Sequence, residues 1–472
     1  MKGTLQPTLQ TLPLLRHNRF DEQATDISNI SSNVKNILLK YDGRTISQWA
    51  ELGVTIFPSF GQRGRALDDE SHKSIFFTFG SNDREKLTNR INTYNCMGVV
   101  RLRDKGSGDT VQIEIGSRFD EGPKHFFLTY LLSKVFGGSM VDLVDLGHDS
   151  LWDILLAFVF RRRLLEANAV GLFKQYRTFD HNDTRVRGKI DVNEHLRRNI
   201  PFCGNIAYTT HEITFDNPTN HLIRHSLAKV ARKWGGLLTG DSRLTEVRRQ
   251  LEQNTPTWQQ CDVMGCVRLK ENQTRIRHPY FNSVYEPLRQ LSLAILREEG
   301  ASLYQKHQEA EGVIFDGSWL WEDYLWTLLK RLPGFNHPEN KKKAEGWQTP
   351  PGVTFYPDFF HNETRVVLDA KYRHEKVNQD IRQAEAKQIF AYMFLLDAVH
   401  GGLIKPEKAE DTDEAPSEIR RRVVDAKKAK WHNFSLLPPP SASAVKDFVY
   451  QMGEEEREFI TCIRTQLLGE GP

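Results

Sequence analysis

The sequence is poor in cysteine, and its cysteines form no pattern typical of a metal site or a disulfide framework. The 472 residues include Cys96, Cys203, Cys261, Cys266 and Cys462. Four residues separate Cys261 from Cys266, but no second Cys or His pair completes a zinc-binding set. We therefore expect neither a zinc knuckle nor a set of structural disulfides.

Long apolar segments are also absent. The longest uninterrupted apolar run, Ile154–Phe160, is far too short to cross a membrane. The N-terminal stretch MKGTLQPTLQTLPLLRHNRF contains no sustained apolar region of the kind found in secretory signals. These absences predict a cytoplasmic protein with no membrane contact.

The chain has little net charge and no nucleotide-binding loop. Lys and Arg number 64 and Asp and Glu number 61, which gives a formal net charge of +3. A nucleic-acid surface therefore has to be a local basic patch. No segment matches G-x-x-x-x-G-K-[ST], so by this route the chain binds no nucleotide itself. A chain of 472 residues is expected to form two or three domains.

The segment Thr354–Arg373, TFYPDFFHNETRVVLDAKYR, carries the most candidate chemistry. Aromatic and β-branched residues flank the polar stretch HNET, a pattern that predicts a two-stranded hairpin. Side chains alternate along a strand, so Asp369 and Lys371 share one face. A two-residue turn places Asp358 on that face as well. Asp358 is then diagonal to Asp369 if the turn is Asn-Glu, and directly opposite it if the turn is Glu-Thr.

Two neighbouring carboxylates repel each other unless a cation lies between them, and oxygen ligands suit Mg²⁺. Asp358 and Asp369 are therefore candidate ligands of one or two Mg²⁺ ions, for which Mn²⁺ can substitute. The alternative is a surface hairpin in which Lys371 neutralises both carboxylates, because so short a motif recurs by chance.

Predicted helices precede and follow the hairpin. In Ser318–Arg331 apolar residues recur at the helical period, and Glu322 lies among them. A carboxylate in that position needs a partner, unless it faces solvent on a bulkier helix. Downstream, Gln388 and Tyr392 are one helical turn apart in a predicted helix over residues 377–396, an arrangement that an ordinary helix contact also explains.

Basic residues are concentrated between residues 155 and 200. Ten Lys and Arg stand against five acids there, and aromatic residues are interleaved with them. The candidates for contact with DNA phosphates are Arg161, Arg162, Arg163, Arg187, Lys189, Arg197 and Arg198, together with Lys342 in the Lys-rich run before the hairpin. For any one of them, a solvated helix face is the alternative.

The spacing of Pro357-Asp358 and Asp369-Ala370-Lys371 resembles the PD-(D/E)xK signature of restriction-endonuclease-like nucleases. The resemblance implies an αβββαβ core in which the first helix delivers an acid to the metal and the second helix backs the site with a Gln and a Tyr. The residues it implies are Asp358, Asp369, Glu322 and the Ala370 carbonyl as metal ligands, Lys371 as the residue that orients the attacking water, and Gln388 and Tyr392 as supporting residues.

Longer stretches resemble the McrC family of modification-dependent and related restriction systems. The matching segments are RGKID followed by HLRRN, TFDNPTNHLIRHSL, LWEDYLW, YPDFF, LDAKYR and AKQIFAYM, and the likeness covers roughly residues 95–465. It implies a Mg²⁺-dependent nuclease subunit of an antiviral defence system. Such a subunit cleaves double-stranded DNA within a larger hetero-oligomer that contains an McrB-like AAA+ GTPase.

We therefore expect a mixed α+β protein with four regions. These are an N-terminal extension over 1–94, small and α+β or partly disordered; a β-hairpin and helix over 95–145 that contacts the partner; a mostly helical middle domain with the basic patch over 146–300; and a PD-(D/E)xK nuclease domain over 301–472. Within the last region, residues 407–418 are expected to be a disordered insertion and residues 420–430 a basic helix.

Two other functions stay open on the sequence alone. A non-catalytic adaptor that activates the GTPase would not need the acidic residues. A stand-alone repair nuclease would need no GTPase and would prefer a particular DNA structure. The dependence of cleavage on Asp369 and on the GTPase separates the three functions.

Overall fold

The computed structural model describes most of the chain, in two compact units. The described residues are 9–17, 25–27, 30–57, 74–80, 89–120, 125–138, 140, 151–238, 241–297, 309–338, 347–348, 354–373, 379–408, 421–426, 429–439 and 444–469. Unit 1 comprises Met1–Leu155 and Tyr304–Pro472, and unit 2 comprises Leu156–Leu303. Both contain helices and strands, so the predicted mixture of α and β structure is confirmed. In the described part of the chain, no helix has the length and apolar character needed to span a membrane.

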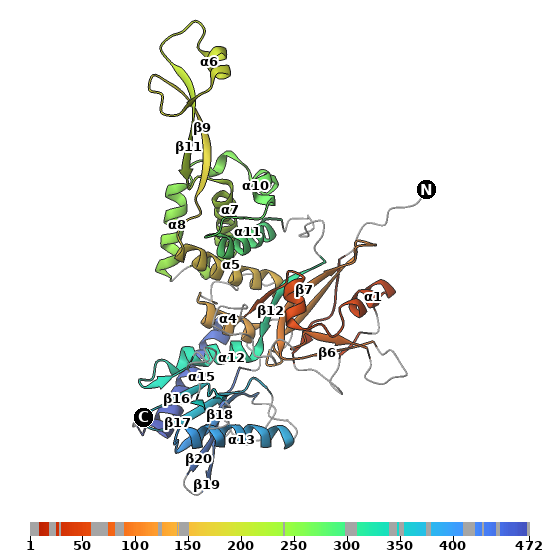
Figure 1. Ribbon diagram of the computed structural model, residues 1–472. Coiled ribbons are helices and arrows are strands. Elements are labelled where there is room, and N and C mark those ends of the chain that lie inside the picture. The colour runs from red at the N-terminus through yellow and green to blue at the C-terminus, as the bar shows by residue number, and fades with distance from the viewer. Residues whose placement is uncertain are drawn as a thin grey trace. The chain divides into compact units, whose positions relative to one another are not determined.

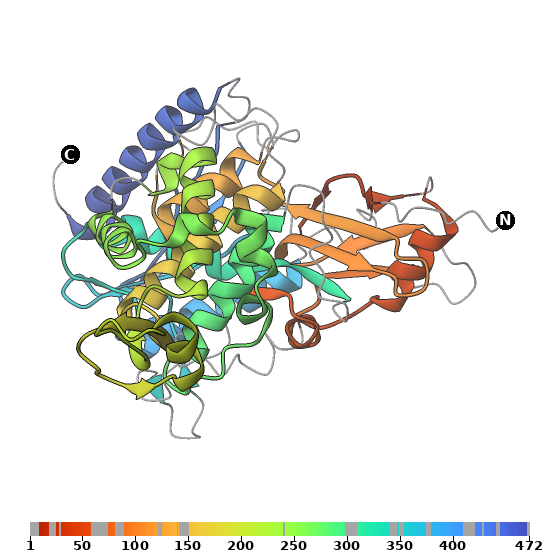
Figure 2. The same cartoon turned by 90° about the horizontal axis from the view of Figure 1, so that it is seen from above.

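The first sheet of unit 1 is built around the β-hairpin that the sequence predicted after residue 97 (Figure 1). Its strands, in the order in which they pair, are β1 (Leu9–Thr11), β8 (Thr110–Gly116), β7 (Cys96–Arg103), β12 (Ala310–Asp316) and β4 (Thr55–Phe57), with β2 (Leu15–Arg16) also beside β8. Helices α1 (Ser32–Lys40) and α2 (Ile46–Glu51) pack against this sheet (Figures 1 and 2).

This sheet crosses the regional boundaries that the sequence predicted. Strands β7 and β8 are interior to it and mostly buried, and the partner contact predicted for residues 95–145 stays a prediction. Residues 1–94 are not a separate extension, because Leu15 and Trp49 share one core with Val100 and Ile314. Strand β12 also belongs here, although the sequence assigned it to the region after residue 301.

The second sheet of unit 1 contains the hairpin with the candidate site. Its strands, in order of pairing, are β13 (Phe335–Asn336), β16 (Phe359–His361), β17 (Val366–Ala370), β18 (His400–Pro406), β20 (Ala429–Leu436) and β19 (Arg421–Ala426). Strands β17, β18 and β20 run parallel. A parallel pair needs a long crossover, which α13 (Gln379–Leu395) provides between β17 and β18.

The helix predicted over residues 420–430 is wrong. Most of that segment forms β19 and the start of β20, with Val423 opposite His432 and Val424 opposite Trp431. Strand pairing along the edge of β20 outweighs the helical interpretation of a charged segment. The predicted disordered insertion falls almost entirely outside the described residues, which resume at residue 421.

Unit 2 combines helices with a long hairpin that projects from them (Figure 1). Its helices are α5 (Leu151–Ala169, from residue 156 onward), α7 (Pro218–Lys233), α8 (Ser242–Asn254), α9 (Val263–Arg268), α10 (Lys270–Gln273) and α11 (Asn282–Arg297). At the start of α7, the Asn217 side chain accepts a hydrogen bond from the Asn220 N–H and Pro218 takes the first helical position.

The hairpin of unit 2 lies within the region predicted to be mostly helical. Strands β9 (Gln175–Asp183) and β11 (Ile206–Thr214) pair antiparallel over their whole length. The short strand β10 (Lys189–Ile190) and helix α6 (Val192–Arg198) lie between them in sequence, at the far end of the hairpin in Figure 1.

A buried carboxylate joins three helices of unit 1, namely α4 (Phe126–Phe136), α12 (Gly317–Leu329) and α15 (Val445–Ile463). Glu456 of α15 is 3% exposed. It accepts hydrogen bonds from Tyr130 Oη at 2.8 Å and Tyr324 Oη at 3.1 Å. It also forms an ion pair with Lys134 Nζ at 2.9 Å. This carboxylate therefore satisfies donors from two neighbouring helices.

We expect Glu456→Ala to lower the free energy of unfolding of unit 1 by about 3–5 kcal/mol, because two phenols and an ammonium group lose their buried acceptor. Urea unfolding followed by tryptophan fluorescence measures the loss. Glu454→Ala is the matched control on the same helix, since Glu454 is exposed and pairs with Arg457 at the surface. It should change the free energy by less than about 0.5 kcal/mol. Equal effects of the two substitutions would contradict the role of Glu456.

Candidate active site

The register of the β16–β17 hairpin brings two carboxylates together. Phe359 pairs with Leu368, and continuing this register places Asp358 opposite Asp369. Of the two registers that the sequence allowed, this is the one expected for a turn at Glu363-Thr364. Asp358 Oδ2 accepts a hydrogen bond of 2.7 Å from the N–H of Ala370, one residue beyond Asp369. The hairpin therefore brings the partly buried Asp358, directly before β16, next to the buried Asp369 of β17.

This arrangement changes the pKa of Asp358. Burial, followed by the charges of Asp369 and Glu322, raises the pKa of Asp358 well above its ordinary value. Asp369 itself is only 2% exposed. Such a pair is stable only if a positive charge is close by.

Lys371 supplies that positive charge. Its Nζ lies 2.5 Å from Asp369 Oδ2. Burial acts to lower the pKa of Lys371, but the carboxylates of Asp369, Asp358 and Glu385 outweigh it, so the pKa is raised and the side chain stays an ammonium group at neutral pH. The structure thus brings together the three residues that the sequence placed on one face of the hairpin.

Gln388 and Tyr392 of α13 form a chain of hydrogen bonds that begins at the Lys371 ammonium group. Lys371 Nζ donates to Gln388 Oε1 at 3.2 Å, Gln388 Nε2 donates to Tyr392 Oη at 2.8 Å, and Tyr392 Oη donates to the Tyr356 carbonyl at 3.0 Å. Burial, followed by the charge of Asp369, raises the pKa of Tyr392, so its hydroxyl keeps its proton. The chain of hydrogen bonds fixes the position of Lys371 from the helix side.

Glu322 lies at the edge of the carboxylate pair, with a histidine that the sequence did not single out. Glu322 on α12 is 9% exposed, and its Oε1 is 3.5 Å from His337 Nε2, close enough for an ion pair when the imidazole is protonated. His337 Nδ1 donates to the Asp358 carbonyl at 2.7 Å. The segment around His337 has no periodic pattern, so nothing in the sequence indicated this contact.

Glu385 is a second residue that the sequence did not single out. It is 4% exposed and forms ion pairs with Arg373 and with Lys405, whose Nζ is 3.5 Å away. Its position could have been inferred, because Glu385 lies three residues before Gln388 and therefore on the same face of α13. Glu385 places two further cations beside Lys371.

Tyr372 fixes the end of the strand that carries the site. It is 2% exposed, and its hydroxyl shares a hydrogen bond of 2.8 Å with Ser117 Oγ. Its ring stacks on His17 at 4.8 Å and on Trp321 at 5.7 Å between ring centroids. The residue after Lys371 is thus anchored to residues near the first sheet and on α12.

The donor set suits a small divalent cation with few protein ligands. Among the described residues, no group of three or more His, Cys, Asp and Glu side chains is placed to hold a metal ion, so Glu322 does not complete a three-carboxylate set. Mg²⁺ does not require one, since it keeps several waters and binds one or two carboxylates together with substrate phosphates. The crowded pair Asp358 and Asp369, next to the Ala370 carbonyl, fits such an ion.

The residues predicted to contact DNA differ in their exposure and in their ion pairs. Arg161 is 3% exposed and pairs with Asp241 at 2.9 Å, so its burial contradicts a phosphate contact. The other candidates in unit 2 are partly or fully exposed. Most of them form ion pairs: Arg162 and Arg163 with Glu166, Arg197 and Arg198 with Glu194, and Arg187 with Asp183 at 3.8 Å. Lys189 is exposed. Lys342 lies outside the described residues.

The comparisons with known proteins agree with the family that the sequence motifs indicated. The family model described as McrBC 5-methylcytosine restriction system component matches residues 91–406. No curated protein sequence matches the chain.

Two solved structures from Thermococcus gammatolerans are similar at low identity. The first is a refined half-complex from a tetradecameric assembly of McrB AAA+ hexamers with bound McrC, at 16% identity and a TM-score of 0.47, covering 94% of this chain and 99% of that chain. The second is the cryo-EM structure of the McrBC complex, at 14% identity and a TM-score of 0.32, covering 68% of this chain and 87% of that chain. Because the family match alone spans two thirds of the residues, this chain belongs to the family of the McrBC 5-methylcytosine restriction system component.

Proposed function

We propose that this chain is the Mg²⁺-dependent DNA endonuclease subunit of an McrBC-type restriction system. The observation that carries the proposal is the pair Asp358 and Asp369, the first partly buried and the second buried, with Lys371 Nζ at 2.5 Å from Asp369. Two like charges held so close together destabilise a fold, so their presence indicates a site selected for chemistry. The family match supports a role in restriction.

In this proposal the residues of the hairpin divide the work of phosphodiester hydrolysis. Asp358, Asp369 and the Ala370 carbonyl would hold Mg²⁺, which would supply Lewis-acid chemistry and a water of lowered pKa. Lys371 would orient the attacking water and offset the negative charge that grows on the phosphate oxygens. Gln388 holds the Lys371 ammonium group in position through a hydrogen bond, and Glu322 and His337 border the carboxylate pair.

The proposal includes an AAA+ GTPase partner. The sequence has no G-x-x-x-x-G-K-[ST] segment, so nucleotide hydrolysis has to come from another chain. One of the similar solved structures contains McrB AAA+ hexamers with bound McrC. By analogy, this chain cleaves double-stranded DNA as part of a hetero-oligomer with an McrB-like GTPase.

The partner surface that we propose lies at the end of the unit 2 hairpin. Large apolar side chains are exposed there, namely Val192 at 60%, Leu196 at 54%, Ile200 at 65% and Phe202 at 64%. Exposed apolar side chains that cluster in one short segment are typical of protein interaction sites.

Replacing Asp358 or Asp369 by Asn, or Lys371 by Met, is expected to lower DNA cleavage by at least about 10²–10³-fold, because each change removes a charge used in the transition state. The measurement is conversion of supercoiled plasmid to nicked and linear DNA with the GTPase, GTP and Mg²⁺ present. Glu363→Gln in the exposed turn of the same hairpin is the matched control and should cleave normally. Full cleavage by a folded Asp369→Asn protein would refute the nuclease proposal and favour the adaptor.

A milder loss is expected for Gln388→Ala. Without Gln388 Oε1 the Lys371 ammonium loses one of the two contacts that fix it, and misplacement of a catalytic group by about 1 Å can cost on the order of 10²-fold. Single-turnover cleavage should slow by about 10- to 100-fold while DNA binding is unchanged. Gln383→Ala, an exposed glutamine on the same helix, should match the parent enzyme. Equal rates for the two variants would remove Gln388 from the site.

The partner surface predicts a defect that is separable from chemistry. We expect the double substitution Leu196→Ser and Phe202→Ser to weaken binding of the AAA+ GTPase by at least about tenfold, because exposed apolar anchors dominate interface energies. Analytical ultracentrifugation measures it. The control replaces Val263 and Met264, which are 39% and 36% exposed elsewhere in unit 2, by Ser.

Cleavage should require both the GTPase and GTP, and strong cleavage by the isolated chain would count against the partner.

A further inference from the structure

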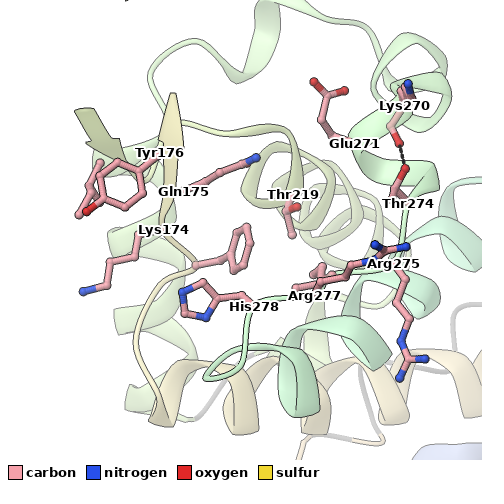
Figure 3. A pocket seen from close by; sticks show the side chains of 13 residues that line it. Lys174, Gln175, Tyr176, Thr219, Lys270, Glu271, Thr274, Arg275, Arg277 and His278 are labelled. Carbon is pink, nitrogen blue, oxygen red and sulfur yellow. Dashed lines mark hydrogen bonds between the residues drawn. The ribbon is translucent and has the colours of Figure 1, made fainter. Parts of the chain in front are cut away.

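A pocket of about 800 Å³ lies where the long hairpin of unit 2 meets its helices (Figure 3). Its apolar lining comes from Phe173 just before β9, Ile213 near the end of β11 and Ile276 after α10. Phe173 is 6% exposed and Ile276 is 8% exposed, so both form fixed walls. The volume is within the range of pockets that bind small organic groups.

The rim of this pocket is basic. It carries Lys174, Lys270, Arg275 and Arg277, against one acid, Glu271. All four cations are exposed, and none forms an ion pair with another described residue. Figure 3 shows Lys174 on the β9 side and Lys270 and Arg275 on the opposite side. The rim therefore offers uncompensated positive charge from two directions.

An exposed aromatic ring stands beside these cations. Tyr176 is 69% exposed and is paired across the hairpin with Ile213, which is 52% exposed. A flexible cation can be solvated without cost, but a large ring and a β-branched side chain left in water indicate a surface that is covered by a ligand. A flat aromatic group is the natural partner of the Tyr176 ring.

We infer that this pocket binds a nucleotide of single-stranded DNA, with its base against Tyr176 and the neighbouring phosphates on the four cations. Aromatic side chains inside a positively charged groove are the elements by which proteins bind single strands. A base within an intact duplex could not enter a concave pocket. An acidic peptide would use the cations but would leave the apolar walls and the ring uncovered. The inference rests on the proposed function only in naming DNA as the ligand.

The test measures binding without cleavage. The full chain is titrated against a fluorescein-labelled thymidine oligonucleotide in EDTA, and anisotropy is followed at several salt concentrations. Arg275→Ala combined with Arg277→Ala should weaken binding by at least about tenfold near 0.1 M salt and should reduce the salt slope by about 1.4, since each single-strand phosphate contact contributes about 0.7. Tyr176→Ala should weaken binding by about tenfold through lost stacking.

An abasic oligonucleotide of the same length separates the base from the backbone. Tyr176→Ala should bind it as the parent chain does, whereas the arginine pair should still show its loss. The matched control is Arg248→Ala combined with Arg249→Ala on α8, two exposed arginines in the same unit that pair with Glu252 and Glu246. It should bind within about twofold of the parent chain.

Three outcomes would overturn the inference. The first is an equal loss for the control pair, which would mean that net charge alone attracts DNA. The second is an equal effect of Tyr176→Ala on the abasic strand. The third is displacement of the oligonucleotide by polyglutamate or by GTP at matched concentration of charge, which would assign the pocket to an acidic protein segment or to a free nucleotide. Because binding is measured in EDTA and cleavage is measured with Mg²⁺, failure of the pocket and failure of the nuclease proposal are distinguishable.

Discussion

The candidate site depends on one physical constraint, which is the close approach of two like charges at facing positions of a hairpin. Asp369 is buried and Asp358 is partly buried, and desolvation, followed by the charges of Asp369 and Glu322, raises the pKa of Asp358. Two protein groups offset it, the N–H of Ala370 and the ammonium group of Lys371. A hairpin optimised only for stability would hold apolar residues at these positions.

This constraint explains why the surroundings of the hairpin are so firmly fixed. Tyr372, next to Lys371, is held by Ser117 and by ring stacking on His17 and Trp321. On the other side, Gln388 reaches Lys371 from α13. A shift of one residue in the strand would turn Asp369 and Lys371 to the opposite face together, so the anchors on both sides preserve the register on which the pair depends. The site is thus supported by sheet and helix, with Asp358 directly before β16 and Lys371 directly after β17.

The sequence revealed those parts of the fold that depend on local periodicity. The hairpin, the helix with Glu322 and the capped start of α7 all follow from alternation, from the helical period or from a capping residue. Long-range pairing left no such trace. Strand β12 pairs with β7, more than two hundred residues earlier, and β19 is a strand only because β20 lies beside it. For the site, Glu385 shared a helix face with Gln388 and could have been found, whereas His337 joins through a bend without a pattern.

Charge is the property for which counting along the sequence was least informative. The excess of basic residues between residues 155 and 200 indicated a DNA surface, yet helical spacing gives many of those arginines an acid three or four residues away, as with Glu166 and Glu194. A paired cation gains little from a phosphate, because it must first give up its carboxylate partner. The cations of the unit 2 pocket come from segments nearly one hundred residues apart, at Lys174 and around Arg275, and have no such partners among the described residues. The position of a nucleic-acid surface is therefore set by which cations the fold leaves uncompensated, and only the three-dimensional structure shows that.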